Sequence, residues 1–464
     1  MKVLKLMPIA GLLACTSLSS SNDGGPDDGS VGIDTGVADA GKDTSNDATS
    51  DVVTEAGADS GATTYNDFTN TSFWTTFDLA SKDTKAVSYA GGTFDGRYVY
   101  FAPDNSPNSS LFARYDTMAP FGSGTSWTLF DAAQIGLSNY GFTGAVFDGQ
   151  HVYFVPYNIG TTDEGFVVQY DTVGSFTTSG SWKSHDMANG SHSGYWGGVF
   201  DGKYIYFVPC YNSDAPGYHG IVNRYDTTSS FTASGSYIPF DTTGVSSSAK
   251  GFYGGVFDGR YVYVAPILNG LITRYDTMGS YAANGAWSTF DTAMNINGAA
   301  VGYIGAGFDG RYAYFVPNGY NGNGSNGLVV RYDTTLTFSS SQSWQSFDAT
   351  MVNANAKGFA YSAFDGRYIY FLPCNAGGAP SSELARYDTQ GAFTSAGSWS
   401  VFDTTKVPGS LQVPGGAKGF GGAVFDGRYL YLVPNGAGTR NGLVLRFDAK
   451  SPPSMPKGYS GSFF

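Results

Sequence analysis

The chain has 464 residues, of which 65 are Gly, 33 Tyr and 34 Phe, and aromatic residues reach 16% while charged residues make up only 14%. This composition is too aromatic for a disordered chain and too rich in Gly for a helical bundle, and it favours many short strands joined by turns. The formal charge of −13 argues against a nucleic-acid-binding surface, so we expect no nucleic-acid partner.

Residues 1–14 have the layout of a secretory signal peptide. Lys2 and Lys5 precede the apolar stretch 6–14, which is too short to span a bilayer as a mature helix. The stretch ends in Leu-Leu-Ala followed by Cys15, and this resembles the lipobox of bacterial lipoproteins. The resemblance implies lipidation of Cys15 and a lipid anchor in the cell envelope, either at the outer membrane or at the cell surface.

Residues 15–64 form the next predicted segment. Residues 16–64 include ten acidic residues, one lysine and no aromatic residue. Such a segment cannot bury enough apolar surface to offset the entropy lost on ordering. We therefore predict a disordered acidic tether over 15–64 that leads to a folded domain over 68–464.

A repeated motif dominates the rest of the chain. Phe-Asp-Gly occurs seven times, at intervals of 51 to 61 residues, and its copies begin at Phe94, Phe147, Phe200, Phe257, Phe308, Phe364 and Phe425. The first six copies each carry four strand signals, A to D, which in the fourth copy cover 252–257, 261–265, 271–276 and 287–290. The period and the strand count predict an all-β fold, a seven-bladed β-propeller with four antiparallel strands per blade.

The strand signals at the two ends of the domain are complementary. A D-type segment at 74–77 precedes the first strand A, and the last A–B–C set at 420–448 has no clear strand D after it. We predict that the N-terminal strand completes the seventh blade, because a closed ring leaves no exposed sheet edges.

Two motifs resemble known propeller families over about residues 68–464. Asp-Gly-Arg-Tyr-Val-Tyr is similar to the YVTN strand, and Arg-Tyr-Asp with a Trp 11 residues after the Asp is similar to the third and fourth kelch strands. All seven copies have Pro where the kelch pattern has Gly-Gly after strand B. The resemblance implies a binding scaffold more often than an enzyme.

Loop lengths distinguish the two faces of the predicted ring. The A–B and C–D spacings are constant at 9 and 11 residues, whereas the B–C spacing varies from 8 to 15 and the D–A spacing from 14 to 22. In an antiparallel blade these two pairs of connections lie on opposite faces, here named the constant face and the variable face. Binding residues concentrate on loops held by a rigid scaffold, so we predict a ligand site on the variable face.

The third copy has the longest B–C spacing and the shortest D–A spacing, and it carries the least repetitive side chains. We predict that they form one ligand site, composed of His192, Trp196, Asp214, Tyr218 and His219. Their spacing matches no metal signature, and the chain contains none of the common catalytic motifs. We therefore predict no catalytic residue, no metal and no cofactor.

Other polar residues are predicted to be structural. The Asp of Phe-Asp-Gly suits a tight turn, and the Arg and Asp of Arg-Tyr-Asp, such as Arg114 and Asp116, suit repeated ion pairs. His151 and His185 replace aromatic residues of the strand-B and strand-D templates, so we interpret both as packing residues.

Together these features predict a monomeric, lipid-anchored cell-surface module that recognises a glycan or a protein through the variable face. One alternative is an extracellular hydrolase or lyase acting on a polymer. That activity would need a carboxylate pair, with Asp104, Asp163, Glu164, Asp214 and Glu383 as candidates. Another alternative is a structural envelope protein, which would show a large exposed apolar patch on its side wall.

Overall fold

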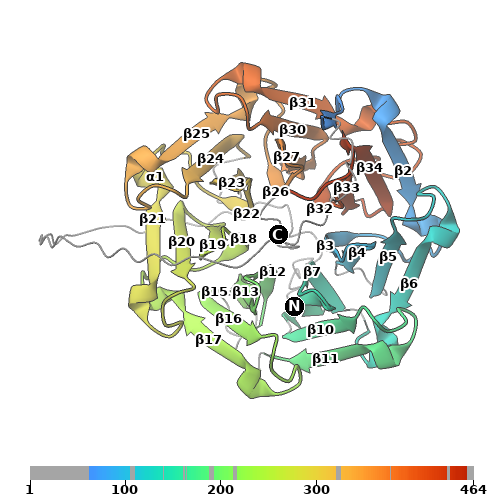
Figure 1. Cartoon of the computed structure of the whole chain (residues 1–464), viewed down its shortest axis with the longest axis horizontal. Coiled ribbons are helices and arrows are strands. Elements are labelled where there is room, and N and C mark those ends of the chain that lie inside the picture. Colours follow the sequence, from blue (N-terminus) through green and yellow to red (C-terminus); the bar gives the residue numbers. More distant parts are fainter. Residues whose placement is uncertain are drawn as a thin grey trace, which may run out of the picture.

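The computed structural model describes residues 62–104, 110–138, 140–159, 162–163, 165–187, 193–212, 217–319, 325–376, 378–435 and 439–456. These residues form seven antiparallel sheets arranged as blades around a central axis (Figure 1). The predicted all-β, seven-bladed propeller with four strands per blade is confirmed. In the described part of the chain, no helix is long and apolar enough to cross a membrane.

Each blade runs from an inner strand A to an outer strand D. The A strands are β3 (Tyr89–Phe94), β7 (Tyr140–Phe147), β12 (Tyr195–Phe200), β18 (Phe252–Phe257), β22 (Tyr303–Phe308), β26 (Phe359–Phe364) and β32 (Phe420–Phe425). The B strands are β4 (Tyr98–Pro103), β8 (His151–Ile159), β13 (Tyr204–Pro209), β19 (Tyr261–Pro266), β23 (Tyr312–Pro317), β27 (Tyr368–Pro373) and β33 (Tyr429–Pro434).

The outer half of each blade consists of strands C and D. The C strands are β5 (Leu111–Asp116), β10 (Phe166–Asp171), β16 (Ile221–Asp226), β20 (Leu271–Asp276), β24 (Leu328–Asp333), β30 (Glu383–Asp388) and β34 (Leu443–Asp448). The D strands are β6 (Trp127–Asp131), β11 (Trp182–Asp186), β17 (Tyr237–Asp241), β21 (Trp287–Asp291), β25 (Trp344–Asp348), β31 (Trp399–Asp403) and, for blade 7, β2 (Trp74–Asp78).

Short helical turns flank the D strands. Those before strand D are 3-10 turns at Thr71–Phe73, Gly124–Ser126, Ser179–Ser181, Ser234–Ser236, Asn284–Ala286, Ser341–Ser343 and Ala396–Ser398. Those after it are 3-10 turns at Leu79–Ser81, Ala132–Ile135, Thr242–Gly244, Ala349–Met351 and Thr404–Lys406, and the single-turn helix α1 (Thr292–Asn295). The Asp that ends strand D caps the turn that follows, as Asp291 does by accepting the amides of Ala293 and Met294.

The two ends of the domain meet in blade 7, as the sequence predicted. Trp74 of β2 lies opposite Phe447 of β34, and Asp78 lies opposite Leu443. Figure 1 shows the blue N-terminal strand beside the dark red sheet of the C-terminal part. A second contact joins β1 (Thr64–Tyr65) to β35 (Lys450–Ser451), so Thr64, the last residue of the segment predicted as a tether, lies in a strand.

The core lies between neighbouring blades. Each strand-D Trp is buried and donates its indole N–H to the carbonyl of the aromatic residue six positions earlier, as Trp127 does to Phe121 at 3.0 Å. In blade 3, Tyr237 replaces the Trp and donates its hydroxyl to Phe231 in the same way. This contact recurs in all seven blades, and in the six blades where strand C leads directly to strand D it holds the connection to one length.

Candidate functional site

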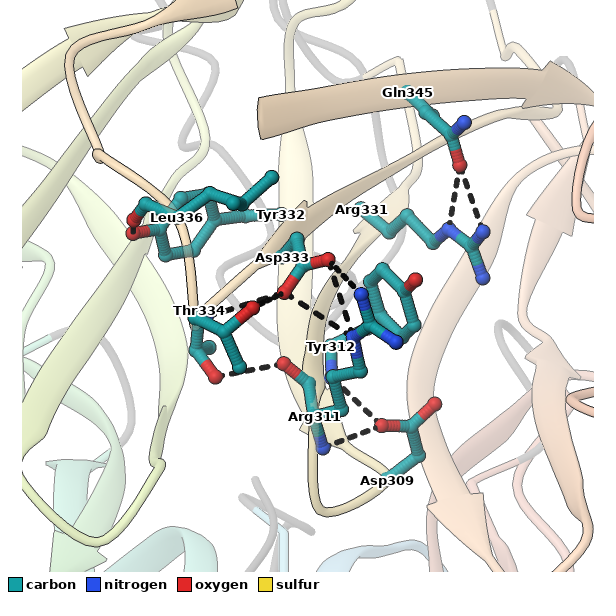
Figure 2. A network of polar contacts seen from close by, with 10 residues as sticks. Asp309, Arg311, Tyr312, Arg331, Tyr332, Asp333, Thr334, Leu336 and Gln345 are labelled. Atoms are coloured by element: carbon teal, nitrogen blue, oxygen red, sulfur yellow. Dashed lines mark hydrogen bonds and ion pairs between the residues drawn. The ribbon is translucent and has the colours of Figure 1, made fainter. Parts of the chain in front are cut away.

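The constant face is built from one hydrogen-bonded turn that recurs in every blade. In blade 5, Asp309 accepts the amides of Arg311 and Tyr312 at 2.8 and 2.7 Å (Figure 2). Asp309 also accepts the hydroxyl of Tyr314 at 2.6 Å. Gly310 has a φ of 99°, which a residue with a side chain rarely adopts. The Asp of Phe-Asp-Gly therefore has the structural role that the sequence predicted.

The ion pairs of the constant face join strands B and C. Asp333 of Arg-Tyr-Asp pairs with Arg311, with 2.6 Å between Nη2 and Oδ2 (Figure 2). Although burial opposes the effect, hydrogen bonds from Arg311 and Thr335 hold the pKa of Asp333 below its usual range. The prediction that the Arg of Arg-Tyr-Asp belongs to this pair is wrong, because Arg331 turns to the next blade and donates to the hydroxyl of Tyr387 at 3.1 Å.

A shallow groove on the constant face separates blades 4 and 5 and includes Arg260, Arg274 and Leu336. Arg260 pairs with Asp276 at 2.7 Å, and the guanidinium of Arg274 lies 4.0 Å from the ring centres of Tyr261 and Phe338. The charged groups of this groove are thus engaged within the fold, and we assign no ligand to it.

Among the described residues, the variable face carries additional hairpins in three B–C connections. In blade 2, β9 (Thr162–Asp163) pairs with the extended end of β8, and in blade 6, β28 (Asn375–Ala376) pairs with β29 (Ala379–Pro380). In blade 3, β14 (Tyr211–Asn212) pairs with β15 (Gly217–Tyr218). These hairpins make the variable face irregular, in contrast to the seven equal turns opposite.

The blade-3 hairpin presents two tyrosines. Tyr211 lies opposite Tyr218 in the hairpin, and their rings meet edge to face with centres 5.2 Å apart. Tyr211 is 37% exposed, whereas Tyr218 is half-buried and lies over Gly251, where an added Cβ would be 2.8 Å from the Tyr218 ring. Gly251 thus lets the hairpin lean toward blade 4.

An aromatic cluster crosses the propeller axis beneath this hairpin. Trp196 of blade 3 stacks on Tyr253 of blade 4 with centres 4.4 Å apart and planes 3° apart. Its indole N–H donates to the hydroxyl of Tyr361 of blade 6 at 2.6 Å. Cys210 and Cys374, each following the Pro of strand B, pack into the same cluster, and Tyr218 packs against it. A hydrogen bond between blades 3 and 6 therefore bridges the axis near the variable face.

Tyr361 occupies an unusual backbone conformation to reach this position. Its φ is 64°, in the left-handed region that bulky side chains avoid. The equivalent third residue of strand A is Gly in the other six blades, at Gly91, Gly144, Gly197, Gly254, Gly305 and Gly422. Such strain costs about 1–3 kcal/mol and concentrates at functional positions. Burial raises the pKa of the Tyr361 phenol, so it stays neutral and can accept from Trp196.

The other side of the axis is small and polar. Blades 1 and 7 place Ala90 and Gly421 where blades 3 and 4 have Trp196 and Tyr253. Asp104 is 7% exposed, and its Oδ2 accepts the amide of Asn435 at 3.0 Å. The cluster is thus aromatic on one side and polar on the other.

Three of the five predicted ligand residues lie in the described part of the chain. Trp196 and Tyr218 meet through the axis cluster. His219 packs its ring edge against Tyr195 and donates its amide to Cys210. His192 and Asp214 lie outside the described residues. Trp196 is only 2% exposed, so within the predicted ligand site it is a core residue of β12 that offers little surface to a ligand.

Two residues of this region were not predicted. Tyr211 is adjacent in sequence to Cys210, and only the register of the hairpin shows that it faces Tyr218. Tyr361 carried a signal that could have been found, because it interrupts a column of glycines in the aligned repeats. The meaning of that interruption depends on its contact with Trp196, 165 residues away in the sequence.

The candidate carboxylates do not form a pair in the described residues. Asp104 lies at the axis, whereas Glu383 begins β30 and accepts the side-chain amide of Asn353 at 3.2 Å. Burial, followed by the charge of Asp403, raises the pKa of Glu383. The side chain of Asp163 and all of Glu164 and Asp214 lie outside the described residues. Within the described ranges, no three His, Cys, Asp or Glu side chains could together hold a metal ion.

No family model and no curated protein matches this sequence. Among solved structures, YCF48 bound to D1 peptide matches with 12% identity and a TM-score of 0.49, over 81% of this chain and 96% of that chain. YCF48 from Cyanidioschyzon merolae matches with 10% identity and a TM-score of 0.48, over 81% and 98%.

PorZ, an essential surface component of the type-IX secretion system of Porphyromonas gingivalis, matches with 11% identity and a TM-score of 0.46. That match covers 84% of this chain but only 40% of PorZ. At these identities and TM-scores, none of the similar structures bears on what this chain binds.

Proposed function

We propose that this chain is a lipid-anchored binding module of the cell surface whose variable face recognises a glycan or a protein. The observation that carries the proposal is the asymmetry of the two faces. On the constant face the polar groups of the repeated turns are used within the fold, as Asp309 and Arg311 are (Figure 2). The variable face adds hairpins of unequal form over a strained aromatic cluster.

The proposed contact surface is centred on the blade-3 hairpin. Tyr211 offers an exposed ring, and Tyr218 holds that ring against the axis cluster. Tyrosine combines a large rigid apolar surface with a hydroxyl, and it recurs at protein and carbohydrate contacts for that reason. In this proposal His219, His192 and Asp214 contribute polar contacts from the same blade, and Trp196 supports the floor.

The anchor is proposed to be Cys15, followed by the acidic tether, and the module to be monomeric at the outer membrane or cell surface. Cys15 and most of the tether lie outside the described residues. β1 follows the tether and pairs with β35, which comes directly after the constant-face end of β34. The tether therefore joins the domain at the constant face, and this leaves the variable face open to a partner.

The binding proposal is tested with the full chain, solubilised in detergent, on glycan and surface-protein arrays. Replacing Tyr211 and Tyr218 together with Ala should weaken binding of the detected ligand by at least about tenfold, as for a hot spot, because both rings are lost. Met278→Ala is the matched control, since Met278 is 82% exposed on the constant face. The absence of binding on both arrays, or an equal loss of binding in the two variants, would contradict the proposal. Cleavage of an arrayed polymer would instead favour the hydrolase or lyase.

The anchor is tested separately by metabolic labelling with a fatty-acid analogue and by membrane fractionation. Cys15→Ser should abolish the label and release the protein from membranes, because no acyl chain can be attached. A variant that stays labelled and membrane-bound would show that the anchor lies elsewhere.

A further inference from the structure

Neighbouring blades are joined at their outer strands by a belt of stacked rings. In six of the seven seams, the strand-D Phe of one blade stacks on the strand-D Trp of the next, with ring centres 4.2 to 5.4 Å apart. These pairs are Phe77–Trp127, Phe130–Trp182, Phe240–Trp287, Phe290–Trp344, Phe347–Trp399 and Phe402–Trp74. Stacked rings contribute beyond the area that they bury, so each pair strengthens its seam.

The same six seams carry an arginine clamp. The strand-C Arg lies between the first strand-B Tyr of its own blade and an aromatic ring of the next, as Arg331 does at 3.9 Å from Tyr312 and 4.3 Å from Phe393. The six arginines are Arg114, Arg224, Arg274, Arg331, Arg386 and Arg446. A guanidinium over a desolvated ring is attracted by the ring quadrupole, so the clamp is a second link between blades.

The seam between blades 2 and 3 lacks the arginine clamp and has a His–Tyr stack in place of the Phe–Trp pair. His185 replaces the Phe and Tyr237 replaces the Trp, and their rings stack with centres 4.8 Å apart and planes 25° apart. Gln169 replaces the Arg and turns back to its own blade, where its amide donates to the hydroxyl of Tyr153 at 3.1 Å. His151 replaces the Tyr that would support a clamp. Four departures from the repeat thus meet at one seam.

The inner half of this seam keeps its contacts. The hydroxyl of Thr143 in blade 2 donates to the carbonyl of Tyr195 and accepts the amide of Gly197, both at 3.2 Å. An added Cβ at Gly198 would be 2.9 Å from Val146, which shows how closely the two A strands pack. The seam is therefore held at the inner strands and weakened at the outer ones, and this is the geometry of a hinge.

His185 adds an ionisable group at the weakened part. Its Nε2 is buried and has no hydrogen-bond partner in the described residues. The ionisable groups on the packed elements are Lys183 and Asp186 on its own strand and Tyr225 and Tyr237 on blade 3, while β10 places Val167 opposite it. Burial lowers the pKa of His185 from its usual 6.5, although Asp186 acts in the opposite direction.

We propose that the seam between blades 2 and 3 is an acid-sensitive opening of the ring, in which protonation of His185 separates β11 from β17. The protonated imidazole would need a water molecule at Nε2, and Nε2 is buried while the seam is closed. The neutral ring is favoured when the seam is closed and the charged ring when it is open, so closure is fully favoured above about pH 6.5 and weakens as the pH falls below it. Because the hairpin β14–β15 belongs to blade 3, opening would also disturb the variable face, and this last step rests on the proposed function.

The test is hydrogen exchange by mass spectrometry on the full chain at pH 7.5 and 5.0, corrected for the intrinsic pH dependence of exchange. It needs no ligand, so its outcome is independent of the proposed function. In the wild type, we expect amides of β11 and β17 to exchange at least about tenfold faster at pH 5.0, a change of roughly 1.4 kcal/mol in opening free energy, with smaller changes at the other seams.

Three variants sharpen the test. His185→Phe should remove the increase in exchange at pH 5.0. His185→Gln should leave the seam weak, but its amides should exchange at the same corrected rate at both pH values. The fourfold change His151→Tyr, Gln169→Arg, His185→Phe and Tyr237→Trp rebuilds the standard seam and should slow exchange at both pH values. An acid response that persists in His185→Phe, or one spread evenly over all seven seams in the wild type, would overturn the proposal.

Discussion

The constant and variable faces use the same strands and differ in where their side chains find partners. On the constant face, partners lie within one blade or its neighbour, as for Asp309 with Arg311 and Tyr314. At the variable face, Trp196 and Tyr361 come from blades on opposite sides of the axis. The repeat specifies local contacts seven times over, whereas contacts across the axis depend on residues that depart from the repeat.

The largest effect is expected from opening the ring, on which both faces depend. Deleting residues 70–80 removes β2, with its five residues paired to β34, and two of the stacked pairs. We expect loss of the cooperative unfolding transition in calorimetry, because blades 6, 7 and 1 all lose core contacts. Deleting residues 16–61 should leave the melting temperature unchanged. Equal melting temperatures for the two deletions would mean that β2 does not close the ring.

The next largest effect is expected from substitutions in the axis cluster, which test whether this cluster is part of the hydrophobic core. Trp196→Ala should cost about 3–5 kcal/mol of unfolding free energy, as expected for a buried aromatic residue. Tyr361→Phe keeps the ring but leaves the indole N–H without its acceptor, and should cost about 1–3 kcal/mol. Urea unfolding measures both values. A Trp196→Ala variant as stable as wild type would mean that the axis cluster does not contribute to the core.

The constant-face turn should show a similar cost in any blade. Asp309→Ala removes the acceptor of the Tyr314 hydroxyl, which is buried, and of two amides, so we expect a loss of about 1–3 kcal/mol. Asp258→Ala in blade 4 removes the same three contacts and is the matched comparison. Urea unfolding that gave very different costs for the two variants would show that the blades are not equivalent on this face.

The smallest effect is expected from an exposed ion pair. The Arg260 side chain is 57% exposed, so Arg260→Gln should lower the stability only slightly. The hydrogen bond from Arg260 lowers the pKa of Asp276 from its usual 3.8. The pair therefore stabilises the fold at neutral pH and loses its effect as the pH falls below about 4. Unfolding curves between pH 7 and 2 should show a shallower acid dependence in the variant, and an unchanged one would mean that the pair is not formed in solution.

The fold could be predicted because its signals are local and repeated. The Asp-Gly turns, the aromatic B strands and the strand-D tryptophans each appear at fixed spacing, and the surplus strand D at Trp74 pointed to closure. The resemblance to kelch and YVTN repeats rests on those motifs alone, since no family model matches.

The candidate site could be predicted only in part. The unusual loop lengths of blade 3 predicted a site there, and the structure packs Tyr218 against the cluster that contains Trp196. The burial of Trp196 could not be predicted, because it is covered by Tyr253 and Tyr361 from other blades. His185 was correctly interpreted as a packing residue. Its place in a weakened seam depends on Gln169 and Tyr237, whose pairing across blades is not visible in one repeat.

The closing strand also determines how the domain would respond to mechanical load. Tension arriving from the N-terminal side enters at β1 and passes to β2, which runs from the constant face toward the variable face. β1 is held by its pairing with β35, so this short pair carries the load before β2 does. Only a pull strong enough to separate β1 from β35 would reach the five residue pairs between β2 and β34 that close the ring. The closure of the ring is thus protected by a smaller contact that precedes it in the chain.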